Sequence, residues 1–250
     1  MALHVTTKLA YWHMPKTGGM SIYRIMRTLP NTEHRKILGP YKHGPPTEIP
    51  LSALKGRTLF GTVRDPWSWY LSVYQHASHD EEGKALLAQV GNGSSKFRDV
   101  LYGMTHPLDV IDMPEKFTCV YLVRDPIREA ARSDYLGSGL GLCSWTFRHT
   151  YGRPARPSVF LDTSRLVEGM ADLLCRPVEE ILTVSQQNRA EHRPRSYIPD
   201  AAKLYDDEMT QWVADADAPL IETFGFTEPY GNAREVLMDS EHLQFSPSLR

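Results

Sequence analysis

Cysteine is scarce in this sequence of 250 residues. The cysteines lie far apart and form neither a C-x-x-C pair nor the Cys/His spacing of a zinc site; they are Cys119, Cys143 and Cys175. An odd and sparse set of thiols is also a poor disulfide framework. We therefore expect reduced cysteines, a cytoplasmic location and no bound metal.

Long apolar runs and an excess of charge of one sign are lacking as well. No stretch of about 18 apolar residues occurs, and the first residues lack the basic-then-apolar pattern of a signal peptide, so we expect no membrane span and no secretion. The formal net charge of -2 at pH 7 gives no overall attraction to nucleic acid. Nucleic acid is therefore not an expected partner, and any anion binding must be local.

The composition is that of an ordinary globular protein, with 41% hydrophobic and 23% charged residues. A chain of this length can bury a substantial core within one domain. We predict a single domain over residues 1–230. Residues 231–250 show no clear periodicity and are predicted to form a C-terminal tail.

Residues 9–27 read as a buried strand, a tight turn containing glycine, and an amphipathic helix. Ile22, Ile25, Met26 and Leu29 follow the i, i+3, i+4, i+7 spacing of one helix face, which can pack on a sheet. The N-terminus of such a helix carries free backbone N–H groups and the positive end of the helix dipole. The turn before the helix is therefore a candidate anion site.

The turn supplies further groups that suit an anion. Gly18 and Gly19 let the backbone approach a ligand closely, while Lys16 and the hydroxyls of Thr17 and Ser21 add side-chain donors. The order of these residues excludes the usual ATP loop, which reads G-x-x-x-x-G-K-[ST] and places Lys after the glycines. Here Lys16 and Thr17 come before them.

The sequence His-Met-Pro-Lys-Thr-Gly-Gly-Met-Ser at positions 13–21 resembles the 5′-phosphosulfate loop of sulfotransferases that use 3′-phosphoadenosine 5′-phosphosulfate (PAPS). It is closer to the carbohydrate-type members, which carry Pro-Lys-Thr-Gly-Gly. The resemblance implies that this loop binds the 5′ end of the nucleotide; the residues concerned are Lys16, Thr17, Gly18, Gly19, Met20 and Ser21. The alternative is an ordinary strand-to-helix turn that happens to contain Lys and Gly.

A second motif follows the apolar run Thr58–Val63, which we predict to be a buried strand. Arg64 comes directly after it, Pro66 can begin a helix, and Ser72 follows eight positions after Arg64. This arrangement resembles the 3′-phosphate site of PAPS sulfotransferases, in which Arg64 and Ser72 would contact the phosphate. The alternative is a surface Arg–Asp pair at a strand end.

Residues 118–126 nearly repeat this pattern, with an apolar strand followed by Arg124, Asp125 and Pro126. The residue eight positions after Arg124 is Arg132 rather than serine. We therefore assign the 3′-phosphate to Arg64 rather than to Arg124.

The remaining candidate groups lie in predicted loops. In sulfotransferases a His or Glu after the first helix often acts as the base, and His43 in the Pro- and Gly-rich segment 31–50 fits that role, with Glu48 in reserve. The basic segment 186–197 resembles the loop that covers the nucleotide, so Arg193 and Arg195 could contact phosphate. An ordinary surface histidine and a solvated basic loop are the alternatives.

Alternating strands and helices predict an α/β fold: a three-layer domain with a central parallel sheet flanked by helices, the P-loop-like sulfotransferase fold. Further elements are expected at 158–161 (strand), at 166–174 (helix) and from about residue 200 (helix). Segment 137–152, rich in glycine and aromatics, either lines an acceptor pocket or packs on the core.

The resemblance implies transfer of a sulfuryl group from PAPS to a hydroxyl or amine of an acceptor, a glycan or a small molecule, with release of adenosine 3′,5′-bisphosphate and no metal. Lys16 and His43 are the expected catalytic residues. Two alternatives stay open: an ATP-dependent P-loop-like phosphotransferase, and a nucleotide-binding protein without catalytic activity.

Overall fold

The computed structural model describes residues 2–28, 34–38, 51–111, 128–152, 156–191 and 204–227. Contacts divide these residues into two compact units. The first takes the described residues up to Arg64 and those from Thr150 to residue 191; the second takes those from Asp65 to His149 and from residue 204 to residue 227. The prediction of one domain over 1–230 stays a prediction.

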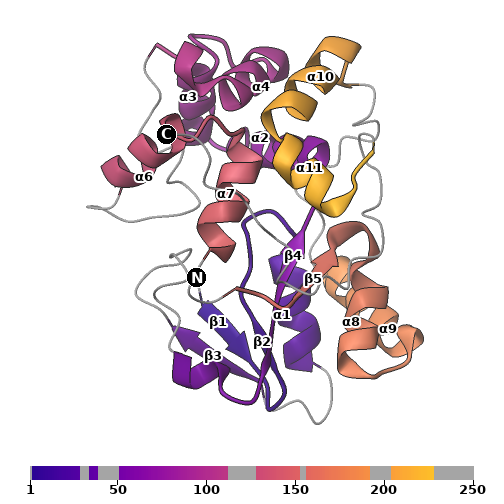
Figure 1. Ribbon diagram of the computed structural model, residues 1–250. Helices are drawn as coiled ribbons and strands as arrows, with labels where there is room; N and C mark the ends of the chain where they lie inside the picture. Colours follow the sequence, from indigo (N-terminus) through magenta and orange to yellow (C-terminus); the bar gives the residue numbers. More distant parts are fainter. Residues whose placement is uncertain are drawn as a thin grey trace. The chain divides into compact units, whose positions relative to one another are not determined.

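The first unit is built on a mixed sheet, which has five strands within these ranges (Figure 1). In the order in which they lie side by side, the strands are β3 (Arg35–Leu38), β1 (Ala2–Val5), β2 (Leu9–Tyr11), β4 (Thr58–Val63) and β5 (Val159–Asp162). β2, β4 and β5 are parallel, with Tyr11 opposite Phe60 and Val63 opposite Asp162. β1 is antiparallel to both of its neighbours.

The α/β class and the strand over 58–63 are confirmed. The central sheet was expected to be parallel; β2, β4 and β5 are parallel, but the sheet is mixed because β1 is antiparallel to its neighbours. β1 and β2 form a hairpin, in which the Thr6 hydroxyl accepts the Leu9 N–H at 3.0 Å. A connection this short can only join antiparallel strands. Segment 31–50 was expected to be loop throughout, yet Arg35–Leu38 pairs with β1 as an edge strand.

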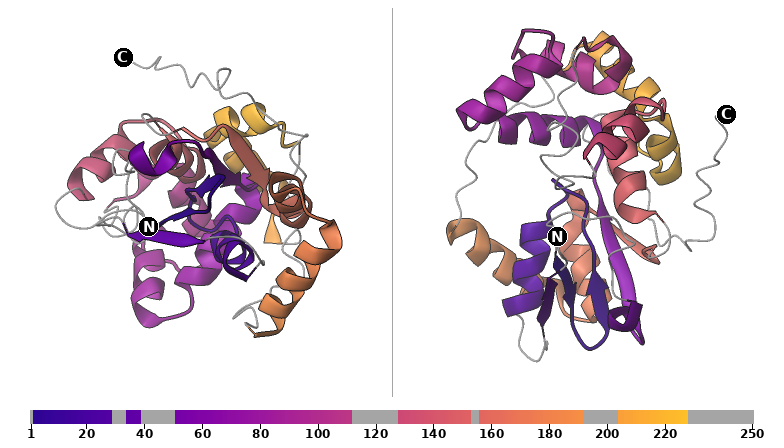
Figure 2. Two further views of the ribbon diagram at one scale, coloured as in Figure 1. Left: turned by 90° about the horizontal axis from the view of Figure 1, so that it is seen from below. Right: turned by 90° about the vertical axis from the view of Figure 1, so that its left-hand side faces the viewer.

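Within the described ranges, the helices that belong entirely to the first unit are η2 (Leu51–Leu54), α1 (Gly19–Thr28), η4 (Thr163–Arg165), α8 (Leu166–Leu174) and α9 (Val178–Glu191). α1, α8 and α9 contribute buried side chains to the core against the sheet. Ile22, Ile25 and Met26 of α1 are fully buried, as the spacing predicts, in a cluster that includes Phe60 and Ile181. α9 packs against both α1 and α8 (Figure 2).

The predicted elements at 158–161 and 166–174 are confirmed as β5 and α8. The expectation of a loop from residue 186 is wrong, because α9 continues to Glu191. No Gly or Pro interrupts the chain between residue 178 and Pro194, so the helix has no local reason to end earlier.

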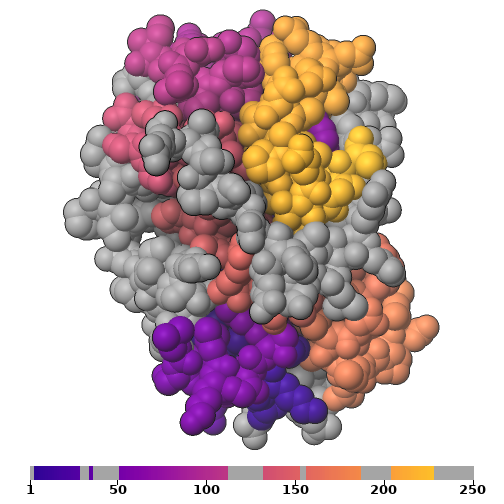
Figure 3. Space-filling view, in the orientation of Figure 1, coloured from indigo at the N-terminus to yellow at the C-terminus, as the bar shows by residue number. Residues whose placement is uncertain are grey.

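The second unit is helical throughout its described part. Its helices are α2 (Pro66–Ala77), α3 (Glu81–Val90), α4 (Phe97–Thr105), η3 (Pro107–Asp109), α6 (Arg128–Leu136), α7 (Leu142–Tyr151, whose last two residues belong to the first unit), α10 (Asp207–Ala216) and α11 (Ala218–Phe224). α10 packs on α4, and the two meet on the surface in Figure 3. Aspartates cap three of the helices: Asp65 accepts the Ser68 N–H, Asp80 the Gly83 N–H and Asp206 the Met209 N–H.

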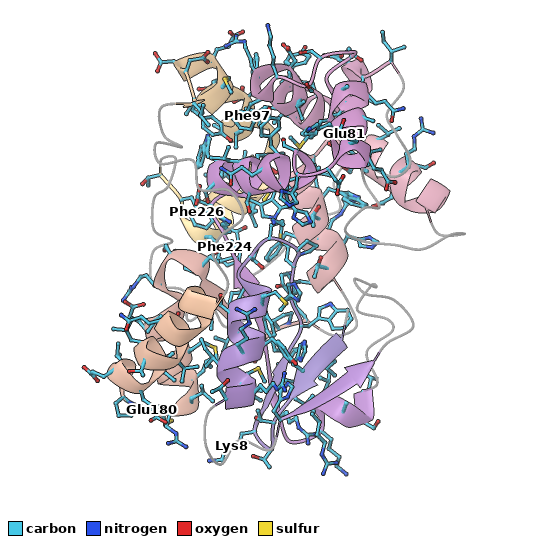
Figure 4. All side chains as sticks on the ribbon, turned by 180° about the vertical axis from the view of Figure 1, so that it is seen from behind. Lys8, Glu81, Phe97, Glu180, Phe224 and Phe226 are labelled. Atoms are coloured by element: carbon cyan, nitrogen blue, oxygen red, sulfur yellow. The ribbon has the colours of Figure 1, made fainter. Side chains whose placement is uncertain are left out.

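The predicted helix beginning at Pro66 is confirmed as α2. Segment 137–152 contains the buried helix α7, with Cys143 and Trp145 fully enclosed, which favours the packed alternative. The last helix begins at Asp207 rather than near residue 200 and is followed by α11. Gly225 ends α11 in the left-handed conformation, between the buried Phe224 and Phe226 (Figure 4).

No helix in the part of the chain that the structure describes is long and apolar enough to cross a membrane.

A buried carboxylate connects the junction of α10 and α11 to two further helices of the second unit, α2 and α7. Asp217, between α10 and α11, accepts the Tyr70 hydroxyl of α2 at 2.7 Å and the Ser144 N–H of α7 at 2.7 Å. Gly141 leaves room for it, because a Cβ there would lie 2.6 Å from Oδ2. Burial raises the pKa of Asp217 to about 6, although the hydrogen bonds act in the opposite direction.

Replacing Asp217 by Asn should change how stability depends on pH. The folded chain holds this proton up to about pH 6, whereas the unfolded chain releases it near the ordinary pKa of 3.8. The stabilisation from this group is therefore present at low pH and is lost as the pH rises from about 4 to about 6. Urea unfolding followed by tryptophan fluorescence should show the wild type losing stability relative to D217N across this window. Parallel curves for the two proteins would contradict the raised pKa.

Candidate functional site

The turn between β2 and α1 is held in an unusual backbone conformation. Lys16 has a φ of 65° and Gly18 a φ of 78°, both in the left-handed region. Glycine adopts this region without strain, whereas a lysine there is strained and needs support from its surroundings. The Gly18 carbonyl accepts the N–H groups of Ser21 at 2.9 Å and Ile22 at 3.2 Å, which starts the helix at this turn.

The backbone N–H groups of residues 17–20 donate to no atom within the ranges that the structure describes. Thr17 and Gly19 are nevertheless buried. These groups stand at the start of the ten-residue helix α1, where the dipole is positive. Consecutive N–H groups in this setting bind anions.

Lys16 and Arg64 come together at the turn. Arg64 Nη1 donates to the Lys16 carbonyl at 3.2 Å. Because β2 and β4 are parallel neighbours, the residues that follow them lie at the same edge of the sheet. The pairing of these two strands thus brings Arg64, the first residue of the second motif, to the turn that carries Lys16.

The charge of Lys16 is disfavoured by its surroundings. Burial, and then the positive charge of Arg64, lower the pKa of Lys16 from 10.5 to about 8. Both effects oppose the ammonium form. An anion bound between the two cations would offset both effects.

The structure corrects the expectation that the Thr17 hydroxyl is a phosphate donor. That hydroxyl is fully buried and gives its one proton to the Met14 carbonyl at 2.7 Å. It also lies 2.6 Å from the Thr62 hydroxyl. Thr17 remains a candidate ligand through its backbone N–H only.

The other predicted residues that the structure describes differ in how enclosed they are. Met20 and Ser21 are exposed on the first turn of α1, so the Ser21 hydroxyl is accessible while its N–H is held by Gly18. Gly19 is tightly packed, because a Cβ there would lie 2.4 Å from the His13 ring. Ser72 is half-buried on α2 in the second unit, whereas Arg64 belongs to the first.

Several predicted groups fall outside the described residues: His43, Glu48, Arg124, Arg193 and Arg195. Their roles stay predictions. In the part of the chain that is described, no group of three or more His, Cys, Asp or Glu residues could hold a metal ion.

Two residues that hydrogen-bond to the turn, Thr62 and Tyr151, were not predicted from the sequence. The Tyr151 hydroxyl accepts the Met14 N–H at 2.8 Å and the Thr62 N–H at 2.9 Å, and donates to the Thr62 carbonyl at 3.1 Å. Thr62 could have been singled out, because it is a threonine near the end of a largely apolar strand. No local pattern points to Tyr151, which lies 137 positions after Met14.

Comparison with known proteins gives no relative: no family model, no curated protein and no solved structure matches the chain. The interpretation of the site therefore depends on its own residues and their geometry.

Lys16 should react with an amine-specific acylating reagent with a pH midpoint near 8, because only the neutral amine is nucleophilic. Replacing Arg64 by Gln should raise the midpoint, since a neighbouring positive charge is removed, but not to 10.5, because burial remains. Mass spectrometry of the Lys16 peptide after brief labelling at a series of pH values measures this. A wild-type midpoint near that of an ordinary lysine, about 10.4, would contradict the geometry.

Proposed function

We propose that the chain is a PAPS-dependent sulfotransferase, which moves a sulfuryl group from PAPS to a hydroxyl or amine of an acceptor such as a glycan or a small molecule. The observation that carries the proposal is the convergence of Lys16, Arg64 and the N–H groups of residues 17–20 where two parallel strands end. We also propose the three-layer, P-loop-like sulfotransferase fold for this α/β protein, and the cytoplasm as its compartment.

The donors at the turn suit a nucleotide with phosphates at both ends. Amide N–H groups accommodate an oxyanion at close range, and an arginine offers a planar, bidentate contact to a second one. The order of Lys16 before the glycines favours PAPS over ATP. When bound, PAPS supplies an activated sulfuryl group.

The residues take the following proposed roles. The N–H groups of residues 17–20 hold the 5′ end, and Arg64 and Ser72 hold the 3′-phosphate. Lys16, still mainly protonated at pH 7, stabilises the negative charge that develops on the leaving phosphate oxygen. Positioning and charge stabilisation of this kind dominate the related phosphoryl transfers.

Three further roles belong to the same proposal and concern residues outside the described ranges. His43 accepts the proton of the acceptor group, with Glu48 as the reserve base. Arg193 and Arg195 add contacts to the phosphates. No metal is required in this scheme, because cationic side chains and amides balance the charge of the nucleotide.

The full chain should bind adenosine 3′,5′-bisphosphate in the presence of EDTA, and more tightly than it binds ATP with Mg²⁺. Affinity should fall as the pH rises above about 8, because the Lys16 ammonium is lost. Since an anion raises the pKa of Lys16, binding near pH 8.5 should take up protons, which isothermal titration calorimetry in buffers of different ionisation enthalpy detects. Lys16→Met should remove this uptake. Tighter, Mg²⁺-dependent ATP binding would favour the phosphotransferase alternative, and binding of neither nucleotide would refute the site.

Incubation with PAPS labelled in the sulfuryl group and a panel of acceptors should give labelled product. Lys16→Ala should lower turnover by about 10²–10³-fold, the loss typical of removing one charge-stabilising group. Lys8→Ala is the matched control, because Lys8 is an exposed lysine just before β2, at the opposite end of that strand from the turn (Figure 4). Bisphosphate binding without product from any acceptor would favour a non-catalytic nucleotide-binding protein.

A further inference from the structure

The turn that carries Lys16 is hydrogen-bonded to buried hydroxyl groups. Tyr11, Thr17 and Thr62 are fully buried, and Tyr151 is nearly so. The Tyr11 hydroxyl lies 3.2 Å from the Thr62 hydroxyl, which lies 2.6 Å from that of Thr17. These contacts connect β2, the turn and the end of β4.

The protons of these hydroxyls can be assigned because each hydroxyl has only one. Thr17 donates to the Met14 carbonyl, which can only accept. Thr62 must then donate to Thr17, and Tyr11 must donate to Thr62. The chain of hydrogen bonds therefore runs in one direction and ends on the backbone of the turn.

Tyr151 provides a second, independent attachment. Its hydroxyl uses both lone pairs and its proton on the Met14 N–H and on the N–H and carbonyl of Thr62. Gly61 makes this approach possible, because a Cβ there would lie 2.8 Å from the Tyr151 ring. The neighbouring Thr150 carbonyl accepts the Trp12 indole N–H at 3.1 Å, which attaches the same segment to the residue after β2.

We propose that Thr62 and Tyr151 are positioning residues, which hold the turn in its strained conformation so that Lys16 stands beside Arg64 before any anion arrives. This inference deepens the proposed function and, as far as nucleotide binding is concerned, rests on it. Burial keeps Tyr151 protonated by raising its pKa to about 12, so the attachment persists over the working pH range. The strained φ of Lys16 is the backbone feature that this support maintains.

The test uses the full chain with Thr62→Val, Tyr151→Phe and two controls. Thr62→Ser keeps the hydroxyl and should behave as the wild type. Tyr135→Phe is the control for general destabilisation, because Tyr135 is an equally buried tyrosine whose hydroxyl donates to the Met104 carbonyl at 2.7 Å in the second unit. Thermal unfolding of each variant is recorded alongside the two readouts below.

The first readout is the pH midpoint of Lys16 acylation, which needs no ligand. Thr62→Val and Tyr151→Phe should move this midpoint upward from about 8, because a relaxed turn exposes Lys16 and separates it from Arg64. Thr62→Ser and Tyr135→Phe should leave it unchanged. The second readout is affinity for adenosine 3′,5′-bisphosphate, which should weaken about tenfold in the first two variants, the equivalent of one buried hydrogen bond.

If Thr62→Val and Tyr151→Phe lower the unfolding temperature as Tyr135→Phe does but leave the acylation midpoint in place, the two residues are merely structural and the inference is overturned. If Thr62→Val does not fold, the Lys16 acylation midpoint of Tyr151→Phe alone decides between a positioning role and a merely structural one. If the midpoint moves but the wild type does not bind the bisphosphate, positioning stands and the proposed function fails. The two results are thereby distinguished.

Discussion

The main physical constraint on the candidate site is the repulsion between two positively charged side chains, Lys16 and Arg64, at one edge of the sheet. Lys16 follows β2 and Arg64 follows β4, and parallel pairing of these strands places both cations at one edge. The arrangement is unfavourable in the unliganded chain, because Lys16 is partly desolvated as well as repelled. Anion binding would remove the repulsion, so the energy of this arrangement favours a ligand with concentrated negative charge.

The turn has two sides. One side presents the N–H groups of residues 17–20. The other side is held by hydrogen bonds to the buried hydroxyls of Thr62, in β4, and Tyr151, at the end of α7. Thr17 belongs to both sides, since its N–H remains available while its hydroxyl faces Met14 and Thr62. A site whose donors are fixed in advance loses little freedom when a ligand binds, which is the general advantage of preorganisation.

Local pattern was enough to predict the parts of the fold that rest on periodicity. The helix after the turn, the strand before Arg64 and the helix beginning at Pro66 all follow from spacing, β-propensity and Pro placement. From two strand-to-helix junctions one could also expect Lys16 and Arg64 near one another. The hairpin and β3 escaped prediction because strands of three or four residues give too little alternation to recognise.

Other contacts between distant parts of the sequence could not be predicted. Tyr151 reaches Met14 across 137 positions, and Asp217 reaches Tyr70 across 147, and no local signal marks either residue. The contact between the hydroxyls of Thr17 and Thr62, which lie 45 positions apart, was likewise not visible in the sequence, so the Thr17 hydroxyl was expected to be a phosphate donor; its backbone N–H remains a candidate ligand. For His43, Arg193 and Arg195 the resemblance to sulfotransferases is still the sole basis of the assignment.

A crystal of the full chain soaked with adenosine 3′,5′-bisphosphate gives the most direct test that one site binds both ends of this nucleotide. One phosphate should lie within hydrogen-bonding distance of the N–H groups of residues 17–20 and of Lys16 Nζ, and the other against the Arg64 guanidinium. A nucleotide bound elsewhere, or a turn that stays empty at saturating concentration, would contradict the assignment.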